Sequence, residues 1–476
     1  MSMKRIVVIG GGAAGLASAF ALKRAVDAGK ELDWILLEKD NRLGGKIQTV
    51  YEDDFIVDGG PDCYLSEKPW MAQMAARVGI SEQLLGSNDA RKKTYIYASR
   101  KLHELPDGVM MMVPTRFLPF ATTSLFSWPA KLRMGMELFV PRKSDGADET
   151  LASFVRRRLG RECLDRLAEP MVGGVHASDP EQMSLRATFP RFLEMEQKYG
   201  SLIRAFIAAR GKMPPPPPPK PGAIPRTYFM TFQKGMQQIT DAMADAAGRE
   251  KLLTGKQVSC IEERPTQPHF RVHATDGTTY EADAVIVSAE AYLAASFLRE
   301  LDNKLADVLD SIPWTSAATV SLAYRAERLG HDLHGFGFLV PGVEKCRLMA
   351  ATFSSTKWLG RAPAGHALIR AFVGGPHNQA LAELEDDEMI RTVRDELREI
   401  MGVEAEPEKA WVFRWLRGMP QYTLGHLERL EFIDRRIEDH PGLFLCGNSY
   451  RGIGTGDCMN SGEQAVTKAL QLLFGE

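Results

Sequence analysis

Apolar runs that end in glycine or an acidic residue open the chain. Ile6 to Ile9 is continuous, apolar and β-branched, which is typical of a strand buried on both faces. The apolar positions then take a helical spacing from Leu16 to Val26, and a second strand-like run covers Trp34 to Glu38. This pattern predicts a strand, a turn, a helix and a second strand at the start of an α/β domain.

Similar patterns return in the second half of the chain. Three runs predict strands that rejoin the first domain, namely Gln257–Ile261, Phe270–Ala274 and Ala284–Ala289. Two others, Val320–Tyr324 and Ala367–Val373, are assigned to a second sheet. A strand after Gly442 then enters a glycine-rich loop, which precedes a helix from Asn460 to Phe474. A strand–glycine–helix unit this far from the first indicates a discontinuous nucleotide-binding domain that the C-terminal segment closes.

The turn after the first strand carries the clearest chemistry. Gly10, Gly12 and Gly15 stand at G-x-G-x-x-G spacing. In such a turn the first glycine permits a tight bend, the second lets the backbone approach a pyrophosphate, and the third allows close helix–strand packing. Glu38 lies about twenty residues beyond the last glycine, where a carboxylate can accept hydrogen bonds from a ribose. The sequence therefore predicts a dinucleotide site.

Composition and charge narrow the class of protein. The chain has 476 residues and a formal net charge of −2, so two or three domains are expected and no overall field points to nucleic acid. Six scattered cysteines form no C-x-x-C or Cys/His cluster, which argues against a metal site and favours reduced thiols in the cytoplasm. The N-terminus runs straight into the first strand, so we expect no cleavable signal, and no apolar run has transmembrane length.

The middle of the chain leaves two interpretations open. Residues 110–128 are apolar and broken by prolines, and Lys131, Arg133, Arg142 and Lys143 flank them. Such a segment can lie on the inner face of a membrane, or it can pack on the core of a helical subdomain. The pattern from Asp148 to Ala208 is helical, and the basic run Arg156–Arg158 is expected on a solvated face. The proline-rich residues 211–226 predict a stiff surface loop rather than a partner ligand.

The predicted organisation is an α/β fold with a Rossmann-like domain in three pieces, an α+β substrate domain and a helical, membrane-associating or core-packed subdomain. The expected boundaries are listed in chain order: 1–90 (first part of the nucleotide domain), 91–210 (helical subdomain), 211–226 (loop), 227–297 (second part), 298–412 (substrate domain) and 413–476 (C-terminal part).

Several motifs together resemble one known family. The opening glycine turn, the segment Arg42-Leu-Gly-Gly45-Lys46 and the strand that ends in Gly59-Gly60-Pro61 look like the FAD-binding domain of the amine-oxidase-like flavoproteins. Glu169-Pro-Met-Val-Gly-Gly-Val175, Met419-Pro-Gln-Tyr422 and Gly452-Ile-Gly454 extend the likeness over nearly the whole chain. The sequence is similar to the oxygen-dependent protoporphyrinogen oxidase family, and in particular to its Gram-positive-type branch, which includes coproporphyrinogen III oxidases.

The resemblance implies a cofactor and a reaction. FAD, rather than NAD, takes electrons from a porphyrinogen in three two-electron rounds, O2 reoxidises the flavin to give peroxide, and no side-chain catalyst is required. The residues expected to bind FAD are Gly10, Gly12, Ala13, Ala14, Gly15, Glu38, Lys39, Arg42, Gly45, Lys46, Gly60, Pro61, Asp62, Val258, Trp415, Gly447, Ile453, Gly454 and Thr455. Thr94, Gly174, Leu339 and Phe372 match substrate positions, and the backbone of Gly174 is expected near the reacting carbon.

One position bears on substrate choice. Family members specialised for protoporphyrinogen commonly carry an arginine where this chain has Thr94, although Arg91, Lys92 and Lys93 lie beside it. This difference favours coproporphyrinogen III over protoporphyrinogen IX without deciding between them. His176 and Met459 also depart from the family pattern.

Other functions stay open at this stage. An amine-oxidase-like FAD oxidase of another substrate would share the nucleotide-binding end, and a flavin- or tetrapyrrole-binding scaffold would bind without turnover. The resemblance also raises peripheral membrane contact, transfer of product to ferrochelatase and a homodimer as open expectations. Neither a nucleic-acid partner nor a metal is expected.

Overall fold

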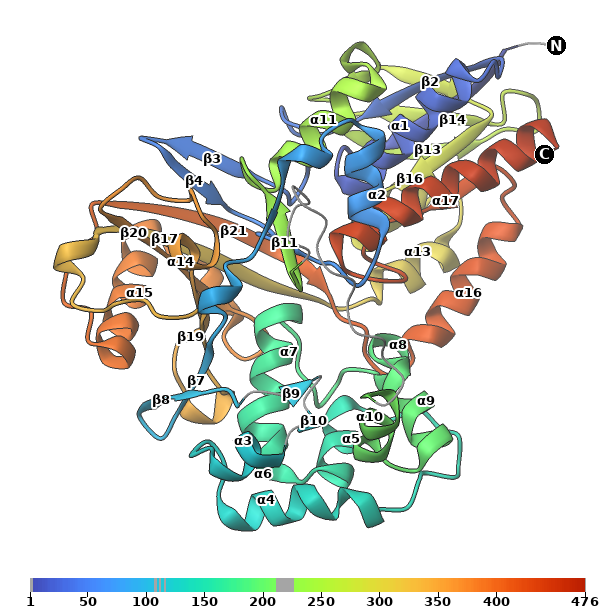
Figure 1. Ribbon diagram of the computed structural model, residues 1–476. Coiled ribbons are helices and arrows are strands. Elements are labelled where there is room, and N and C mark those ends of the chain that lie inside the picture. Colours follow the sequence, from blue (N-terminus) through green and yellow to red (C-terminus); the bar gives the residue numbers. More distant parts are fainter. Residues whose placement is uncertain (1–2, 107–108, 111–112, 115–116, 211–226, 476) are drawn as a thin grey trace.

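The computed structural model describes residues 3–106, 109–110, 113–114, 117–210 and 227–475. Figure 1 shows a parallel sheet with its helices at the upper right, a second large sheet at the left, and a group of helices below both. The predicted α/β fold with a Rossmann-like domain is confirmed. The proline-rich loop 211–226 lies outside the described residues.

The first sheet assembles from segments far apart in the chain. Its five strands all pair in parallel, in the order β12 (Leu252–Leu253), β2 (Leu32–Leu37), β1 (Lys4–Ile9), β16 (Ala284–Val287) and β22 (Leu443–Leu445). Ile6 and Val8 pack into one hydrophobic cluster, and Val7 and Ile9 pack into another on the opposite face. Burial on both faces explains the continuous apolar run of β1.

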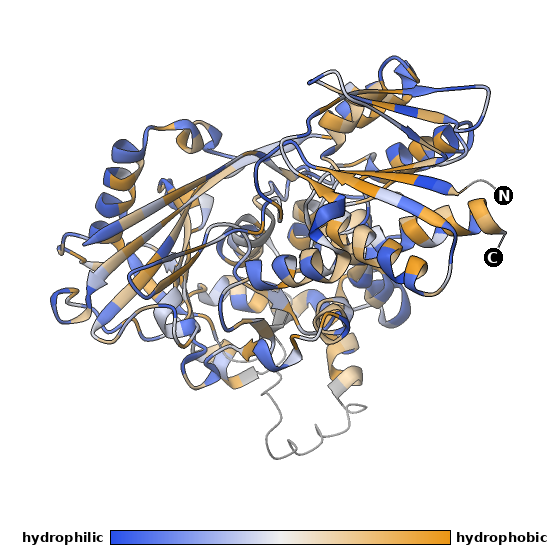
Figure 2. Cartoon of the chain, turned by 90° about the horizontal axis from the view of Figure 1, so that it is seen from above, coloured by the Kyte–Doolittle hydropathy of each residue, from blue (hydrophilic) through white to orange (hydrophobic). Residues whose placement is uncertain are grey.

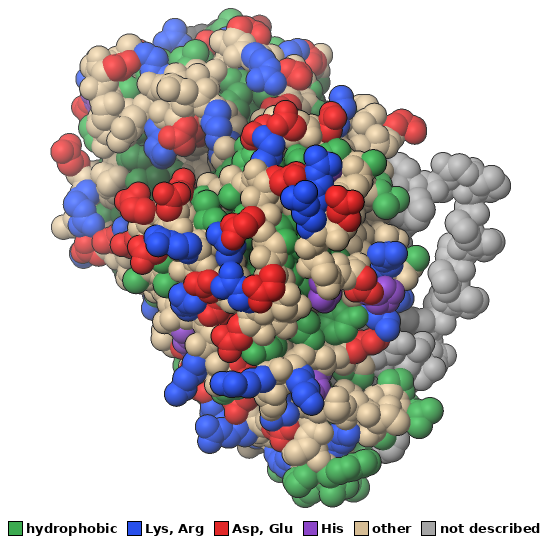
Figure 3. Space-filling model, turned by 90° about the vertical axis from the view of Figure 1, so that its left-hand side faces the viewer, with side chains coloured by type: hydrophobic (Ala, Val, Ile, Leu, Met, Phe, Trp, Pro, Cys, Tyr) green, Lys and Arg blue, Asp and Glu red, His purple; other side chains and the backbone are tan. Residues whose placement is uncertain are grey.

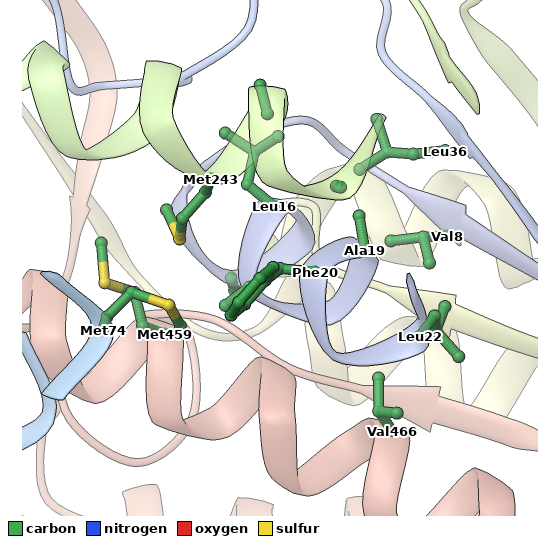
Figure 4. Packing of buried hydrophobic residues seen from close by; sticks show 14 of the residues in the cluster. Val8, Leu16, Ala19, Phe20, Leu22, Leu36, Met74, Met243, Met459 and Val466 are labelled. Atoms are coloured by element: carbon green, nitrogen blue, oxygen red, sulfur yellow. The ribbon is translucent and has the colours of Figure 1, made fainter. Parts of the chain in front are cut away.

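Helices from the beginning, the middle and the end of the chain cover one face of this sheet. They are α1 (Ala13–Asp27), α2 (Trp70–Arg77), α11 (Gln237–Ala247) and α17 (Thr455–Phe474). Figure 4 shows Leu16 and Phe20 of α1 among Met74, Met243, Met459 and Val466 from the other three helices. The atypical Met459 is thus a core residue. Helix α17 packs closely on α1, because a Cβ on Gly462 would lie 2.1 Å from the carbonyl oxygen of Ala14.

The opposite face carries a small antiparallel sheet and three helices. The strands are β13 (Val258–Glu263), β14 (Phe270–Ala274) and β15 (Thr279–Ala282), and the helices are α12 (Ala291–Leu298), α13 (Asn303–Asp310) and α16 (His426–Glu438). Residues 257–289 thus lie against the first sheet, which β16 joins by pairing with β1. Figure 2 shows, from above, that both termini lie on the lobe that holds the parallel sheet.

The second large sheet has seven strands. Their order is β21 (Lys409–Pro420), β17 (Trp314–Arg325), β20 (His366–Gly374), β19 (Leu348–Phe353), β18 (Gly337–Leu339), β7 (Thr94–Ala98) and β8 (Lys101–Glu104). Helix α15 (Asp386–Met401) covers one face. The sheet differs from the expected boundaries, because β7 and β8 come from the range 91–210 and β21 extends past residue 412. Parallel pairing of β7 with β18 draws these two strands out of the helical region.

The remaining chain supplies the helical subdomain and short connecting sheets. The helices are α3 (Phe117–Thr122), α4 (Trp128–Gly135), α5 (Leu151–Arg158), α6 (Arg161–Cys163), α7 (Glu169–His176), α8 (Leu185–Thr188), α9 (Pro190–Tyr199) and α10 (Leu202–Arg210), with a 3-10 turn, η3, at Met136–Phe139 and a π-helical turn at Leu164–Ala168. The short sheets pair β3 (Thr49–Glu52) with β4 (Phe55–Asp58), β9 (Val109–Met110) with β10 (Val113–Pro114), and β11 (Phe229–Phe232) with β5 (Tyr64–Leu65) and β6 (Leu84–Gly86).

The basic run in α5 corrects one expectation. Arg156 is exposed, but Arg158 is fully buried and cannot lie on a solvated face. Its position on the helix turns it into the subdomain, where Glu137 and Glu196 accept hydrogen bonds from its guanidinium. Among the described helices, none is long and apolar enough to span a bilayer.

Candidate cofactor and substrate site

The glycine turn has the geometry that a pyrophosphate needs. A Cβ on Gly15 would lie 1.8 Å from the carbonyl oxygen of Gly10, so this position serves close helix–strand packing. A Cβ on Gly12 would have only the Gly45 Cα within 4 Å, so the space before Gly12 is open. Leu16 donates the first helical bond to the Gly12 carbonyl, which leaves the preceding N–H groups, Ala13 and Ala14 included, without a partner in the helix. An anionic group fits this opening.

Glu38 lies beside the turn and is only 7% exposed. Its carboxylate accepts hydrogen bonds from the backbone N–H groups of Gly11, at 2.6 Å, and Asp40, at 2.8 Å. Burial raises the pKa of this carboxyl above its usual value. The Lys256 N–H donates to the Glu38 carbonyl at 2.7 Å, which brings the start of β13 and its Val258 to the same end of the site. These contacts suit the ribose end of a dinucleotide.

Lys39, Arg42 and Lys46 are occupied by protein groups. Lys39 pairs with Asp40 at 2.8 Å, and the Lys46 ammonium pairs with Glu290. The Arg42 guanidinium donates to the carbonyls of Leu43 and Ile47, each at 3.2 Å, and to that of Gly45. Arg42 therefore braces the glycine loop through these carbonyls.

The C-terminal segment closes the same edge of the parallel sheet. Gly447 follows β22, and its N–H donates to the Ser461 hydroxyl of α17 at 2.9 Å. Ser288, at the end of β16, donates its hydroxyl to the Gly10 carbonyl at 2.8 Å. Ile453 and Gly454 lead directly into Thr455, the first residue of α17, so a second helix N-terminus lies at this edge. Carboxyl ends of parallel strands are where ligands bind in such sheets.

Close backbone approaches connect the turn to the second sheet. A Cβ on Gly45 would lie 3.0 Å from the Gly12 Cα, and one on Gly60 would lie 1.7 Å from the Lys46 carbonyl oxygen. The Gly59 carbonyl accepts hydrogen bonds from Trp415 Nε1, at 2.9 Å, and from the Thr319 hydroxyl, at 2.8 Å. An elongated cofactor that starts at Gly12 can follow this path to Gly60 and Trp415.

The substrate residues expected from the resemblance lie on the sheet face that the path reaches. Strand pairing places Leu339 opposite Ala350, Ala350 opposite Phe372, and Phe372 opposite Thr319. Residues paired across neighbouring strands share one face of a sheet. A Cβ on Gly174 of α7 would lie 2.8 Å from Leu339 Cδ2, so Gly174 packs at the far end of this row.

Thr94 shares the face with that row. Thr94 pairs with Gly337, which is two residues before Leu339 on β18. Since every second residue of a strand lies on the same face, the side chains of Thr94 and Leu339 share one face of the sheet. Basic neighbours Arg91 and Lys92 are exposed, and Lys93 pairs with Glu104 at 2.8 Å. The structure thus brings Thr94, Leu339 and Phe372 together on one face of the sheet, and Gly174 of α7 packs against that face at Leu339.

A buried charged cluster behind the Gly59–Asp62 loop was not expected. Asp62 accepts hydrogen bonds from Lys357 Nζ and Trp358 Nε1, both at 3.0 Å, and Arg370 Nη1 lies 3.9 Å away. Burial raises the pKa of Asp62, but the charges of Lys357 and Arg370 outweigh burial and hold it well below its usual value. A signal existed in the sequence, because Arg370 interrupts the apolar run Ala367–Val373 and must find a partner once buried.

A small cavity of about 10 Å³ adjoins this cluster, and its lining includes Asp58, Ser321 and Arg361. Three buried polar atoms of its lining residues have no hydrogen-bond partner among the described residues: Ser321 Oγ, Arg361 Nε and Arg370 Nε. A volume near this size is the least that holds one water molecule.

A second and larger cavity, about 340 Å³, lies elsewhere, between the start of α7 and the ends of β18 and β20. Gly173, Glu169 and His377 line it, whereas the expected substrate residues do not. The expected substrate residues on the paired strands therefore lie outside this cavity. Among the described residues no group of three or more His, Cys, Asp or Glu could hold a metal ion, and all six cysteines are free.

Comparisons with known proteins agree with this geometry. Residues 13–470 match the family described as flavin-containing amine oxidoreductase. The chain is 33% identical to the coproporphyrinogen III oxidase of Bacillus subtilis over 99% of both chains. It is 30% identical to that of Staphylococcus aureus over 98% of this chain and 99% of the relative. Protoporphyrinogen oxidase 2 of Arabidopsis thaliana is 27% identical, over 99% of this chain and 95% of the relative.

A solved structure has the same overall arrangement. A candidate protoporphyrinogen oxidase from Exiguobacterium superposes with a TM-score of 0.85 and 29% identity, over 98% of each chain. A reduced UDP-galactopyranose mutase superposes with a TM-score of 0.73 at 16% identity, over 99% of this chain and 96% of that one, which is a likeness of fold alone. The predicted flavin cofactor is confirmed. The chain belongs to the flavin-containing amine oxidoreductase family.

Proposed function

We propose that this protein is an FAD-dependent porphyrinogen oxidase of heme biosynthesis. It removes six electrons from coproporphyrinogen III to give coproporphyrin III, while three O2 become three H2O2. Relatives with this activity in their names align over almost the entire chain. The observation that carries the proposal is the row Leu339–Ala350–Phe372–Thr319, which runs from Gly174 to the Gly59 carbonyl on one face of the sheet.

The proposed roles of the residues follow from their positions. The N–H groups at the start of α1 and the Glu38 carboxylate hold the pyrophosphate and a ribose, and the start of α17 offers further N–H groups. Leu339 and Phe372, both half-buried, present apolar surface to a flat macrocycle and limit water there. Gly174 lies in the last turn of α7, where carbonyls lack helical N–H partners, and its missing side chain leaves room beside Leu339. Bound FAD supplies the two-electron oxidation chemistry.

Thr94 supports coproporphyrinogen III as the preferred substrate. A charge-assisted contact with a propionate contributes about 1.5–3 kcal/mol, which is about ten- to a hundred-fold in kcat/KM. We expect the wild type to oxidise coproporphyrinogen III at least as well as protoporphyrinogen IX. Thr94→Arg should shift the activity ratio toward protoporphyrinogen, whereas Thr94→Val, which has a similar shape and no charge, should leave the ratio unchanged.

The measurement is kcat/KM for both porphyrinogens at one ionic strength, followed by porphyrin fluorescence. A wild type that is about ten-fold or more better on protoporphyrinogen overturns the substrate assignment and leaves the oxidase proposal intact. Rapid reoxidation by air after anaerobic photoreduction, with peroxide formed, separates an oxidase from a non-catalytic scaffold. Turnover of an amine but of neither porphyrinogen would overturn the proposal.

We also propose that the helical subdomain binds the surface of an anionic bilayer. Five large apolar side chains of α3, α4 and η3 are strongly exposed: Leu118 (74%), Trp128 (68%), Leu132 (70%), Met136 (58%) and Phe139 (80%). Trp128 and Leu132 are four residues apart and lie on one face of α4, and Met136 follows as the first residue of η3. Figure 3 shows hydrophobic side chains at the lower end of the molecule, the end at which α4 lies in Figure 1. We call the five side chains the α4 patch.

Charge beside the α4 patch supports a lipid surface as its partner. Lys131 contacts the Trp128 ring, with its ammonium 4.5 Å from the ring centre, and Arg142 is exposed. Aromatic and aliphatic side chains that enter the lipid boundary, with cations at its edge, characterise interfacial helices.

Co-sedimentation with vesicles of phosphatidylcholine and phosphatidylglycerol tests this surface. Leu132→Gln should reduce the bound fraction several-fold, whereas Leu472→Gln, at a 51% exposed leucine on α17, should not. Equal binding of both variants would contradict the docking surface, and binding unaffected by salt would remove its electrostatic part. Product transfer to ferrochelatase and a homodimer stay predictions from the family resemblance.

A further inference from the structure

The charged cluster behind the Gly59–Asp62 loop carries more positive than negative charge. Lys357, Arg361 and Arg370 supply three cations, and Asp58 and Asp62 supply two carboxylates. Cys63 adds no charge, because burial raises the pKa of its thiol to about 12. Burial lowers the pKa of Lys357, but the Asp62 charge outweighs burial and keeps the ammonium protonated. Lys357 is 7% exposed and Arg370 is 3% exposed, so water screens this excess weakly.

The cluster is joined to the loop that the cofactor path reaches. Arg370 Nη2 donates to the carbonyl of Gly59, at 3.1 Å, and to that of Gly60. Its guanidinium also lies 4.8 Å from the ring centre of Phe372, on the sheet face proposed for the substrate. The unpartnered nitrogens Arg361 Nε and Arg370 Nε show that these cations are not fully paired by the protein.

We propose that Lys357 and Arg370, through the net positive charge they hold behind Gly59–Asp62, set the electron affinity of the bound flavin. The inference rests on the flavin binding of the proposed function and not on its substrate. Reduction adds negative charge to the flavin ring system, and a buried cation nearby favours that charge. The two residues act electrostatically without touching the reacting atoms, so they tune the cofactor and are not catalytic residues.

Sulfite provides a probe that needs no porphyrinogen. It adds reversibly to oxidised flavins, leaves one negative charge on the ring system and bleaches the visible absorbance, so its Kd reports the local charge. Four variants change or preserve the net charge of the cluster, which in the wild type is one positive charge in excess. Asp62→Asn raises the excess, Lys357→Met cancels it, and the double variant Asp62→Asn/Lys357→Met restores it, while Lys357→Arg preserves it. Lys251→Met, which breaks a 2.6 Å pair with Asp33 at the far end of β2, is the matched control.

We expect Lys357→Met to weaken sulfite binding about tenfold or more, which corresponds to about 30 mV for a two-electron couple. Asp62→Asn should strengthen binding by a similar factor, and the double variant, Lys357→Arg and the control should all stay near the wild type. A purely structural role predicts something else, because Asp62→Asn and Lys357→Met break the same ion pair and would then shift Kd in the same direction.

Equal-direction shifts, or a double variant that matches Lys357→Met, would overturn the proposal. If Lys357→Met does not retain flavin, Asp62→Asn still tests the proposal. The proposal requires this variant to bind sulfite more tightly than the wild type, and weaker binding would contradict it. A protein that shows the full series yet turns over no porphyrinogen would refute the proposed function alone.

Discussion

Two buried charged clusters in this protein are built in opposite ways. In the helical subdomain, each nitrogen of the Arg158 guanidinium donates a hydrogen bond, to Glu137, Glu196 or a backbone carbonyl. Glu137 also accepts from the Ser201 hydroxyl and from the N–H of Leu202. Behind the Gly59–Asp62 loop, by contrast, cations exceed carboxylates and polar atoms of Ser321, Arg361 and Arg370 lack partners.

The contrast separates stability from function. Removal of one partner from a well-bonded buried pair leaves an uncompensated charge, so the Arg158 cluster holds η3, α5, α9 and α10 in one arrangement. A cluster with unpartnered donors and an excess of positive charge contributes less to the stability of the fold than a fully paired cluster would. Such unpaired groups are common beside a ligand site. We therefore expect perturbations of the first cluster to change unfolding, and perturbations of the second to change the flavin.

The largest effect is expected at Arg158. Arg158→Met leaves Glu137 and Glu196 buried without their cation and should lower the free energy of unfolding by about 3–5 kcal/mol. Arg156→Met, two positions earlier on the same helix, breaks only an exposed pair with Glu181 and should cost at most about 1 kcal/mol. Urea unfolding followed by circular dichroism measures both. Similar costs for the two variants would remove the distinction between the clusters.

A neutral buried group sharpens the comparison. His426 is 1% exposed, stacks on Tyr422 and shares a 2.9 Å hydrogen bond between Nε2 and the Tyr450 carbonyl, while its Nδ1 has no partner among the described residues. Burial lowers the pKa of His426 from 6.5 to about 4. The unfolded chain thus binds a proton that the folded protein does not, so stability is present above pH 6.5 and is lost as pH falls toward 4.

The loss at His426 should approach about 3 kcal/mol. His426→Gln cannot take up that proton, so the difference in unfolding free energy between variant and wild type should change across this range. Urea titrations at several pH values give the difference, which cancels the contribution of the other titrating groups. Parallel pH profiles for the two proteins would show that His426 is not held neutral.

The smallest effect compares one serine in each cluster. Ser201→Ala removes a hydroxyl that donates to the Glu137 carboxylate and accepts from the Arg204 N–H, so we expect a loss of about 2 kcal/mol. Ser321→Ala removes an equally buried hydroxyl that has no partner among the described residues, and its cost should stay within about 0.5 kcal/mol. If Ser321→Ala lowered the free energy of unfolding as much as Ser201→Ala, a water molecule in the small cavity would have to form a hydrogen bond with the Ser321 hydroxyl.

Local patterns predicted the nucleotide-binding end, because the chemistry there depends on residues close in sequence. The spacing of Gly10, Gly12 and Gly15 fixes the turn, and Glu38 follows at the end of the next strand. The substrate face depends instead on the register of β18, β19 and β20, which no single segment specifies. The family resemblance supplied Leu339 and Phe372, but only strand pairing shows that they share a face.

Charged residues were the hardest to place from sequence. Arg156 and Arg158 are both arginines and stand two positions apart. The α-helix rotates by about 200° between them, so Arg156 lies in water and Arg158 lies in the core. Lys357 lies in the four-residue helix α14 (Ser354–Lys357), where no periodicity indicates which side is buried. The partners of such residues come from distant segments, so sequence position alone cannot reveal them.

The packing of α17 on α1 has a consequence for how the protein is made. Ser18 donates its hydroxyl to the Gly462 carbonyl at 3.1 Å, so two residues 444 positions apart in the sequence meet. On the ribosome, β1 and α1 emerge long before β22 and α17. The apolar face of α1 that packs on α17 therefore stays uncovered until α17 has been synthesised. We expect the nascent chain to acquire its cofactor only after α17 has left the ribosome, and a message truncated before α17 to yield a flavin-free product.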